Sequence, residues 1–275
     1  MYRNAAQSRQ CVGWRMKTSA LGELLQALRQ WRLWMLLGWL EIRQKYARSL
    51  MGPFWITLSM GVMVGSIGLV YGNLFDQKMS EYLPLVGNGF VIWALISGTL
   101  GESCSAYINN ANYIKQSDVV LWIYTLQGVW RQFVMLLHNI IITLILMTVF
   151  GVHTRLCVLW FIPGLIVVVL NIVWIAQILA IISARYRDVP QLVASVLQLL
   201  FYVTPLMWKP AMLKKAQWLI TYNPFASLVD LLRSPLLGDA PDLQSWEVAV
   251  VMLPLGWALA LWLYARKKND VAYWV

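Results

Sequence analysis

The chain has 275 residues, of which 60% are hydrophobic and only 12% are charged, yet its formal net charge is +10. Soluble domains carry about 45–50% apolar and about 25% charged residues, so the composition indicates an integral membrane protein and disfavours soluble catalysis. Three widely spaced cysteines without a CxxC pair argue against a disulfide framework. Because the first 30 residues show no clean apolar region followed by small residues, we expect no cleaved signal peptide.

Residues 1–20 are polar and basic, and we expect a loose N-terminal tail. From Leu21 onward, apolar residues recur at intervals of three and four with basic residues between them, which predicts an amphipathic helix over residues 21–50. Such a helix lies in the headgroup plane of a membrane; an ordinary helix packed on its own protein is the alternative. We favour the membrane interface because an apolar run begins directly after Pro53, and proline suits a first helical turn.

Six apolar runs follow, and about 20 residues suffice to cross a bilayer as a helix. We predict them at residues 54–75, 83–105, 128–150, 156–183, 191–208 and 246–264. The predicted fold is therefore an all-α integral membrane protein with six transmembrane helices. This domain covers residues 53–268, without an internal repeat or a domain linker, and residues 269–275 form a C-terminal tail.

The placement of lysine and arginine predicts the orientation, because these residues concentrate on the cytoplasmic side. With a cytoplasmic N-terminus, nine basic residues flank the inner ends of the runs and six flank the outer ends. The inner residues are Arg43, Lys45, Arg48, Lys115, Arg185, Arg187, Arg266, Lys267 and Lys268, and the outer residues are Lys78, Arg155, Lys209, Lys214, Lys215 and Arg233. We predict that both termini are cytoplasmic.

The segment between the fifth and sixth runs is too apolar for a plain loop. Residues 211–222 and 225–238 are each apolar, but pieces of this length are too short to span. Pro224 disfavours a helical Asn223, so we predict a helical hairpin over residues 209–240 that bends there and re-enters the membrane from the outer side. Irregular backbone at membrane depth needs cover from protein or a water-filled cavity, which makes this hairpin a pathway element. A hairpin resting on the outer leaflet is the alternative.

Catalytic and nucleotide-binding motifs are absent. The sequence has no GxxxxGK[ST], HExxH, GxSxG or GxGxxG pattern, and two histidines are too few for a metal cluster. Glu102 and Arg131 lie near inner ends of their runs and could reach the interface by snorkelling, and we expect His138 to form a hydrogen bond to a neighbouring helix. We predict no catalytic, metal or cofactor site, so uphill transport needs energy from a separate subunit.

Three motifs occur in order along the six runs. They are EIRQKYARSLMGPFW at residues 41–55, ARYRDVP at residues 184–190, and YNPF at residues 222–225 followed by LLR at residues 231–233. Together they resemble the ABC-2 type permeases that export polysaccharides, a group that includes the permeases for O-antigen, capsular polysaccharide and teichoic acid. The resemblance covers about residues 21–268.

The resemblance implies a homodimer in the bacterial inner membrane that pairs with two copies of an ABC ATPase, which binds the ATP and Mg. Two inner loops, residues 108–119 and 184–190, would receive the motion of the ATPase. The first and fifth spans would line one shared channel, and the outer hairpin would narrow its exit.

These implications select candidate site residues. The ATPase-coupling residues are Asn112, Tyr113, Ile114, Lys115, Arg185, Tyr186, Arg187 and Asp188. The channel and substrate residues are Phe54, Trp55, Phe201, Tyr202, Trp208 and Tyr222, and the outer gate residues are Asn223, Pro224 and Phe225. Aromatic faces stack on sugar rings and their polar tips reach hydroxyls, although aromatic belts at membrane interfaces account for most Trp and Tyr. The two arginines could instead be anchors under the positive-inside rule.

The expected function is the permease subunit of an ATP-driven exporter, not an enzyme, that carries a lipid-linked polysaccharide, with O-antigen as the first candidate. An ABC-2 permease for a small lipid or drug is one alternative. A membrane-embedded glycosyltransferase is another, but it needs clustered Asp, Glu or His, and a structural scaffold is a third. Expected partners are the ATPase, the polymer and membrane lipids, and not nucleic acid.

Overall fold

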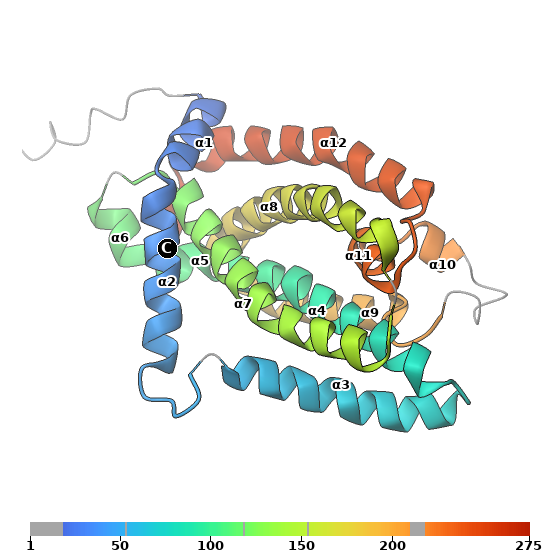
Figure 1. Ribbon diagram of the computed structural model, residues 1–275. Helices are drawn as coiled ribbons and strands as arrows, with labels where there is room; N and C mark the ends of the chain where they lie inside the picture. Colours follow the sequence, from blue (N-terminus) through green and yellow to red (C-terminus); the bar gives the residue numbers. More distant parts are fainter. Residues whose placement is uncertain (1–18, 53, 118, 153, 210–217) are drawn as a thin grey trace, which may run out of the picture.

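A computed structural model describes residues 19–52, 54–117, 119–152, 154–209 and 218–275 (Figure 1). Within these ranges all regular structure is helical and no strand occurs, which confirms the predicted all-α class. The expected N-terminal tail lies almost wholly outside the described residues. So do Pro53 and most of the expected first half of the outer hairpin, residues 210–217.

Two helices form the N-terminal stretch for which we expected one. α1 (Ala20–Arg29) begins after Ser19, whose hydroxyl accepts a hydrogen bond from the Gly22 N–H at 3.0 Å. α2 (Trp31–Tyr46) follows after Gln30, which leaves the helical conformation at φ −88° and ψ 34°. α2 therefore turns away from α1 and lies across the ends of the long helices (Figure 1). The apolar periodicity continues through this break, and no glycine or proline marks it, so the sequence predicted one continuous helix.

Five helices among the described residues are long and apolar enough to cross a membrane, and Figure 1 shows them running side by side. They correspond to the first four predicted runs and the sixth. They are α3 (Phe54–Leu74), α4 (Met79–Ser103), α7 (Trp122–Val149), α8 (Phe161–Arg185), which continues the 3-10 turn η1 (Arg155–Trp160), and α12 (Leu243–Lys267).

The fifth predicted run forms a shorter helix. α9 (Val189–Val203) has 15 residues, about 22 Å of helix at 1.5 Å per residue. Thr204 is extended, with ψ 134°, because the residue before a proline is disfavoured from the helical conformation and Pro205 follows it. The helix that we expected to reach Trp208 therefore ends at Val203.

α4 forms the centre of the bundle. It packs against α3, α7, α8 and α11, and 78% of the residues in its most apolar stretch are buried. Large apolar side chains from α4 fill the core, namely Val86, Phe90, Ile92, Ile96 and Leu100. Helices in a membrane associate through close packing, and small residues allow it. A Cβ added at Gly89 would meet the Leu206 carbonyl oxygen at 3.2 Å, so this glycine lets the chain after α9 approach α4.

α10 (Trp218–Thr221) and α11 (Pro224–Leu237) follow the segment after α9. α11 contacts α4, α8 and α12, and most of its residues are buried. Its backbone meets α8 directly, because a Cβ added at Gly164 would lie 2.6 Å from the Leu231 carbonyl oxygen. α11 is therefore inserted among the long helices and does not rest on their surface. It ends at Gly238, whose φ of +95° favours glycine.

Three short helices lie at the opposite end of the bundle from α10 and α11. They are α5 (Ala106–Asn109), α6 (Ala111–Gln116) and α13 (Val271–Trp274). α5 packs on α7 and α8, and α13 contacts α6 and α8.

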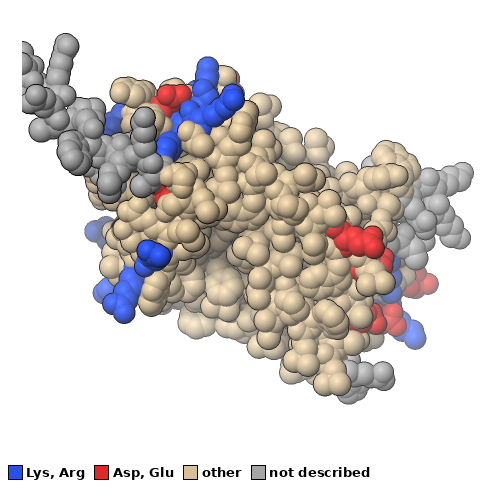
Figure 2. Space-filling view, turned by 90° about the horizontal axis from the view of Figure 1, so that it is seen from above, with Lys and Arg blue, Asp and Glu red and all other residues tan. Residues whose placement is uncertain are grey.

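Basic side chains gather at one end of the molecule, and carboxylates lie mostly at the other, as Figure 2 shows. We call the end formed by α1, α2, α5, α6 and α13 the basic end. The opposite end is formed by α10, α11, the first turn of α12 and the connection from α3 to the first turn of α4, and we call it the acidic end. Described basic residues at the basic end are Arg29, Arg32, Arg43, Lys45, Arg48, Lys115, Arg185, Arg187, Arg266, Lys267 and Lys268. Described carboxylates at the acidic end are Asp76, Glu81, Asp230, Asp239, Asp242 and Glu247, which lie among the basic residues Lys78, Lys209 and Arg233.

Candidate functional site

The residues expected to couple to an ATPase lie on two loops at the basic end. Asn112, Tyr113 and Lys115 of α6 are exposed, whereas Ile114 is buried and fastens the helix to the bundle. The four residues from Arg185 to Asp188, between α8 and α9, are all exposed. The structure thus brings both loops to one surface, where α13 contacts α6 and α8.

Trp274 of α13 is a site residue that the sequence did not reveal. The Arg185 guanidinium lies 5.4 Å and the Lys267 ammonium 5.8 Å from the centroids of its rings, distances typical of cation–π contacts. The Arg187 Nη2 donates a hydrogen bond to the Trp274 carbonyl at 3.3 Å. Both coupling arginines are therefore engaged with α13. Residues 269–275, which we expected to form a plain tail, end in a helix that braces the second loop.

A buried hydrogen-bond network ties the first loop to the long helices. Gln177 Nε2 of α8 donates to the Tyr107 hydroxyl oxygen at 2.6 Å, and Gln177 Oε1 accepts from the Thr125 hydroxyl at 2.7 Å. All three residues are buried. Burial raises the pKa of Tyr107, so its hydroxyl stays neutral at physiological pH. α5 therefore has fixed polar links to α7 and α8, through which displacement of the loop would reach the membrane helices.

An ion-pair cluster fastens α2 to the bundle. Arg131 of α7 donates through Nε at 2.9 Å and Nη2 at 2.7 Å to Glu102 of α4, and its Nη1 pairs with Glu41 of α2. Glu102 and Arg131, which we expected to reach the interface by snorkelling, are thus also paired with each other. Charges removed from water need partners, and spacing along the chain could not show that these three residues meet.

A second polar clamp joins the two ends of the described chain. Glu23 of α1 accepts a hydrogen bond from the Tyr264 hydroxyl at 2.5 Å and pairs with Lys268 just after α12. Both charged side chains are largely buried. Two glutamates thus anchor the N-terminal stretch: Glu23 binds groups at the end of α12, and Glu41 binds Arg131 of α7.

The aromatic residues expected to line a channel fall into two groups. Phe54 and Trp55 at the start of α3, Tyr202 of α9 and Tyr222 are exposed. Phe54 also meets His138 of α7 edge-on at 6.3 Å between ring centroids. His138 Nδ1 bonds to the Val134 carbonyl of its own helix at 2.8 Å. The hydrogen bond to a neighbouring helix that we expected involves its carbonyl, which accepts from the Thr57 hydroxyl of α3 at 3.2 Å.

Phe201 and Trp208 are held by the protein. Phe201 stacks on Phe90 of α4 at 5.4 Å and meets Trp93 at 6.1 Å. Trp93 in turn meets Phe225 of α11 at 6.2 Å. The buried Trp93, which the sequence analysis did not single out, therefore connects an expected channel residue with an expected gate residue. Trp208 is partly buried, and its Nε1 donates to the Tyr202 carbonyl at 3.3 Å.

The predicted bend at Asn223 forms a junction between α9 and α11. Asn223 Oδ1 accepts from the Phe225 N–H at 3.0 Å, which caps the start of α11, where Pro224 occupies the first turn. Asn223 Nδ2 donates to the Thr204 hydroxyl at 3.0 Å. The side chain is buried, so one asparagine orients both the end of α9 and the start of α11.

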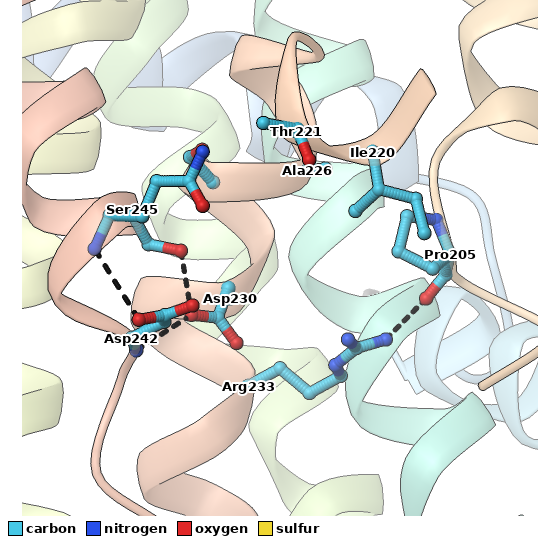
Figure 3. Close-up of a pocket in the computed structure, with 10 residues that line it drawn as sticks. Pro205, Ile220, Thr221, Ala226, Asp230, Arg233, Asp242 and Ser245 are labelled. Atoms are coloured by element: carbon cyan, nitrogen blue, oxygen red, sulfur yellow. Dashed lines mark hydrogen bonds between the residues drawn. The ribbon is translucent and has the colours of Figure 1, made fainter. Parts of the chain in front are cut away.

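A polar cavity of about 290 Å³ opens beside this junction (Figure 3). We call it the polar pocket; its walls are Pro205, Ile220, Thr221, Ala226, Ser227, Asp230, Arg233, Asp242, Gln244 and Ser245. Asp230 accepts from the Ser245 hydroxyl at 2.8 Å and from the Asp242 N–H at 3.1 Å. Arg233 is buried and donates to the Pro205 carbonyl. No motif predicted this pocket, because its walls come from three separate segments.

Within the described ranges, His, Cys, Asp and Glu side chains do not gather in a group of three that could hold a metal ion.

Residues 32–237 match the ABC-2 type transporter family. Two proteins of Klebsiella pneumoniae, each named O-antigen export system permease protein RfbA, are 23% identical to this chain over 191 and 193 residues, which cover 69% of this chain and 74% of theirs. A Myxococcus xanthus protein of the same name is 24% identical over 244 residues, covering 83% of this chain and 90% of its own. Because the family match spans well over half of the chain, this protein belongs to the ABC-2 type transporter family.

Proposed function

We propose that this chain is the membrane permease subunit of an ATP-driven exporter that carries a lipid-linked polysaccharide, with O-antigen as the first candidate, across the bacterial inner membrane. The family match carries this proposal, together with relatives named O-antigen export permeases that align over most of both chains. The five long apolar helices provide the membrane domain.

The path of the chain supports a sixth crossing. α8 ends at the basic end and α12 begins at the acidic end, so the chain passes between the ends through α9 (Figure 1). α9 supplies about 22 Å of helix, which is shorter than the roughly 30 Å of a hydrocarbon core. Residues 204–209 continue it, mostly as bends, in which the Leu206 N–H donates to the Thr204 carbonyl at 2.7 Å, and we propose that they complete the crossing. The irregular residues Thr204, Pro205 and Leu206 are buried, which is the cover that such backbone requires.

The charge of the two ends supports the orientation. Cytoplasmic flanks of membrane helices are enriched in lysine and arginine, so the basic end faces the cytoplasm and the acidic end faces outward. The contact between Glu23 and Lys268 brings the first and last helices of the described chain to the same end, which supports an even number of crossings. α2, which lies across the helix ends and exposes Trp31, Leu36 and Trp39, occupies the headgroup plane.

α10 and α11 form the second half of a re-entrant hairpin at the outer end. α11 is supported in this role by its burial among α4, α8 and α12. Through Asn223 and Trp93 it is linked to α9 and α4, so a change in the channel helices reaches the exit.

The basic end docks a separate ATPase subunit. α6 and residues Arg185–Asp188 form one exposed surface, and the Tyr107 network carries its displacement to α7 and α8. The absence of a phosphate-binding loop in this sequence is consistent with ATP hydrolysis in the partner.

Two copies of the chain form the channel between them. α3 and α9 both pack on α4 and keep exposed faces, and the exposed Phe54, Trp55 and Tyr202 lie on these helices. Gly61 and Gly65 of α3 have open space in front of them, and stripes of small residues favour close helix approach in membranes.

A complementation experiment tests the function. Cells that lack this chain should lose surface polysaccharide and accumulate lipid-linked polymer inside, and the full-length chain expressed with its ATPase should restore export. Arg187→Glu should abolish restoration with normal membrane insertion, whereas Arg266→Glu, an exposed charge reversal outside the coupling loops, should not. Normal surface polymer in cells without the chain would refute the export function. Full export by Arg187→Glu would make this arginine an anchor only.

A further inference from the structure

The polar pocket contains a buried cation with unused donors. Arg233 is only 6% exposed, and Figure 3 shows its side chain along the pocket wall. Its Nη1 donates to the Pro205 carbonyl, and no hydrogen bond within the described residues accounts for its other N–H groups. A guanidinium has five donors, and buried polar groups are normally satisfied. A ligand with oxygen atoms in the pocket would satisfy them.

The pocket walls also carry hydrogen-bond acceptors and groups that can both donate and accept. The Asp230 and Asp242 carboxylates accept hydrogen bonds from protein groups and keep further lone pairs. The Ser245 hydroxyl, which donates to Asp230, can accept. The Ser227 hydroxyl and the Gln244 amide can both donate and accept. α11 supplies Ser227, Asp230 and Arg233, which lie three residues apart and therefore share one helix face. Donors and acceptors that alternate within one cavity match a ligand whose every hydroxyl does both.

Charge and size narrow the ligand further. Two carboxylates and one guanidinium give the walls a net charge of −1. This disfavours phosphates and acidic groups. The volume of about 290 Å³ lies at the small limit of ligand pockets, which span about 300–1,000 Å³. A single sugar unit fits these conditions.

We propose that the polar pocket is a binding site for one neutral sugar unit of the exported polymer at the outer end of the permease. This inference rests on the proposed export function. The site lies beside the Asn223 junction, so an occupied pocket holds α10, α11 and α12 around the emerging chain. Affinity is weak, on the order of 1 mM, because a translocation path needs sites that release their ligand.

Saturation-transfer NMR on the full-length protein in lipid nanodiscs tests the site, with glucose, galactose and mannose as probes and inorganic phosphate as the anionic probe. At least one hexose should give a signal and phosphate should not. Ser227→Leu, which fills the cavity, should weaken that signal about tenfold, roughly the loss of one or two hydrogen bonds. Asp239→Asn, exposed at the same end but outside the pocket walls, should bind normally.

The possible outcomes distinguish a failure of the sugar-site proposal from a failure of the proposed export function. No hexose signal in the native protein, a signal from phosphate alone, or an unchanged signal in Ser227→Leu would each overturn the site, while native export measured in cells would leave the permease function standing. Hexose binding that Ser227→Leu abolishes without reducing surface polymer would also overturn it, because the sugar would then not be part of the exported chain. A protein that binds hexose at this pocket but exports no polymer in complementation would instead refute the proposed function.

Discussion

α3 and α4 are consecutive, similarly apolar helices, yet the chain surrounds one and leaves the other open. In the most apolar stretch of each, 11% of α3 residues are buried against 78% of α4 residues. α4 lies at the centre with helices around it, whereas α3 contacts mainly α4 and α7. The exposed side of α3 carries Val62, Met63, Leu69 and Val70. Two helices of similar hydropathy therefore differ in burial: α4 is the core of the bundle, and α3 lies at its surface.

The difference lies in what each helix offers its neighbours. Glu102 of α4 pairs with Arg131 of α7, and the Tyr82 hydroxyl of α4 donates to the Met207 carbonyl after α9. Polar groups in a membrane need protein partners, so these two side chains hold α4 inside the bundle. The outward side of α3 is aliphatic with open glycines, which lipid or a second copy of the chain can cover equally well. Hydropathy thus identifies a span, and polar and small residues decide which faces meet protein.

The largest effect on the free energy of unfolding is expected where α4 is held by charge. Arg131→Gln leaves Glu41 and Glu102 without a cation. These side chains are 23–37% exposed, so the loss should be about 2–3 kcal/mol, below the roughly 3–5 kcal/mol of a fully buried pair. Lys209→Gln, which breaks the exposed pair with Glu81 at the other end of α4, should cost under about 1 kcal/mol. Denaturant titration in mixed micelles compares the two; equal losses would contradict the buried role of the cluster.

Two glycines of α3 allow contacts within one chain and contacts between two copies to be tested independently. A Cβ at Gly68 would lie 2.1 Å from the Leu83 side chain, whereas one at Gly65 meets nothing within 4 Å. Gly68→Leu should therefore cost about 1–3 kcal/mol by overpacking.

Gly65→Leu should leave the unfolding of the monomer nearly unchanged and reduce cross-linking between copies. If Gly65→Leu dimerises as the native protein does, α3 faces lipid at this position and the proposed channel interface lies elsewhere.

Two tyrosine hydroxyls, one on α4 and one on α3, test the same difference in burial between the two helices. The Tyr82 hydroxyl of α4 donates to the Met207 carbonyl at 2.6 Å, whereas no hydrogen bond of the Tyr71 hydroxyl of α3 occurs within the described residues. Tyr82→Phe should cost about 0.5–1.5 kcal/mol, the usual value of one hydrogen bond. Tyr71→Phe should cost nothing measurable. Thermal unfolding of both variants checks this, and an equal shift would show that α3 is as enclosed as α4.

At Trp274, outside both helices, the expected effect is on coupling more than on stability. Its ring makes two cation–π contacts, with Arg185 and Lys267, each worth about 0.5–1 kcal/mol at partly exposed sites. Trp274→Ala should therefore lower the free energy of unfolding by about 1–2 kcal/mol. It frees Arg185 but keeps the carbonyl that Arg187 contacts, and it should reduce the ATPase activity that the polymer stimulates in the partner subunit. Tyr273→Ala, whose side chain is 85% exposed, serves as the control. Native coupling in Trp274→Ala would restrict α13 to a passive contact.

Local sequence patterns predicted the helices of this protein well, but they did not predict which residues of different helices contact one another. The five long helices, the bend at Asn223 and the collection of basic residues at one end follow from hydropathy, proline and charge along the chain. The early end of α9 was also readable, because Pro205 disfavours a helical Thr204. The break at Gln30 carried no such signal, since glutamine has no distinct backbone preference.

The groups that join the elements lie far apart in the sequence. Glu23 meets Lys268, Tyr107 meets Gln177, and Arg187 meets the Trp274 carbonyl. The walls of the polar pocket likewise come from separate segments. The sequence by itself determined that this is a membrane protein, because several runs of about 20 apolar residues are each long enough to span a bilayer as a helix. Only the tertiary structure decided which charges are paired and which face is open, because burial and pairing depend on distances between helices that no local pattern encodes.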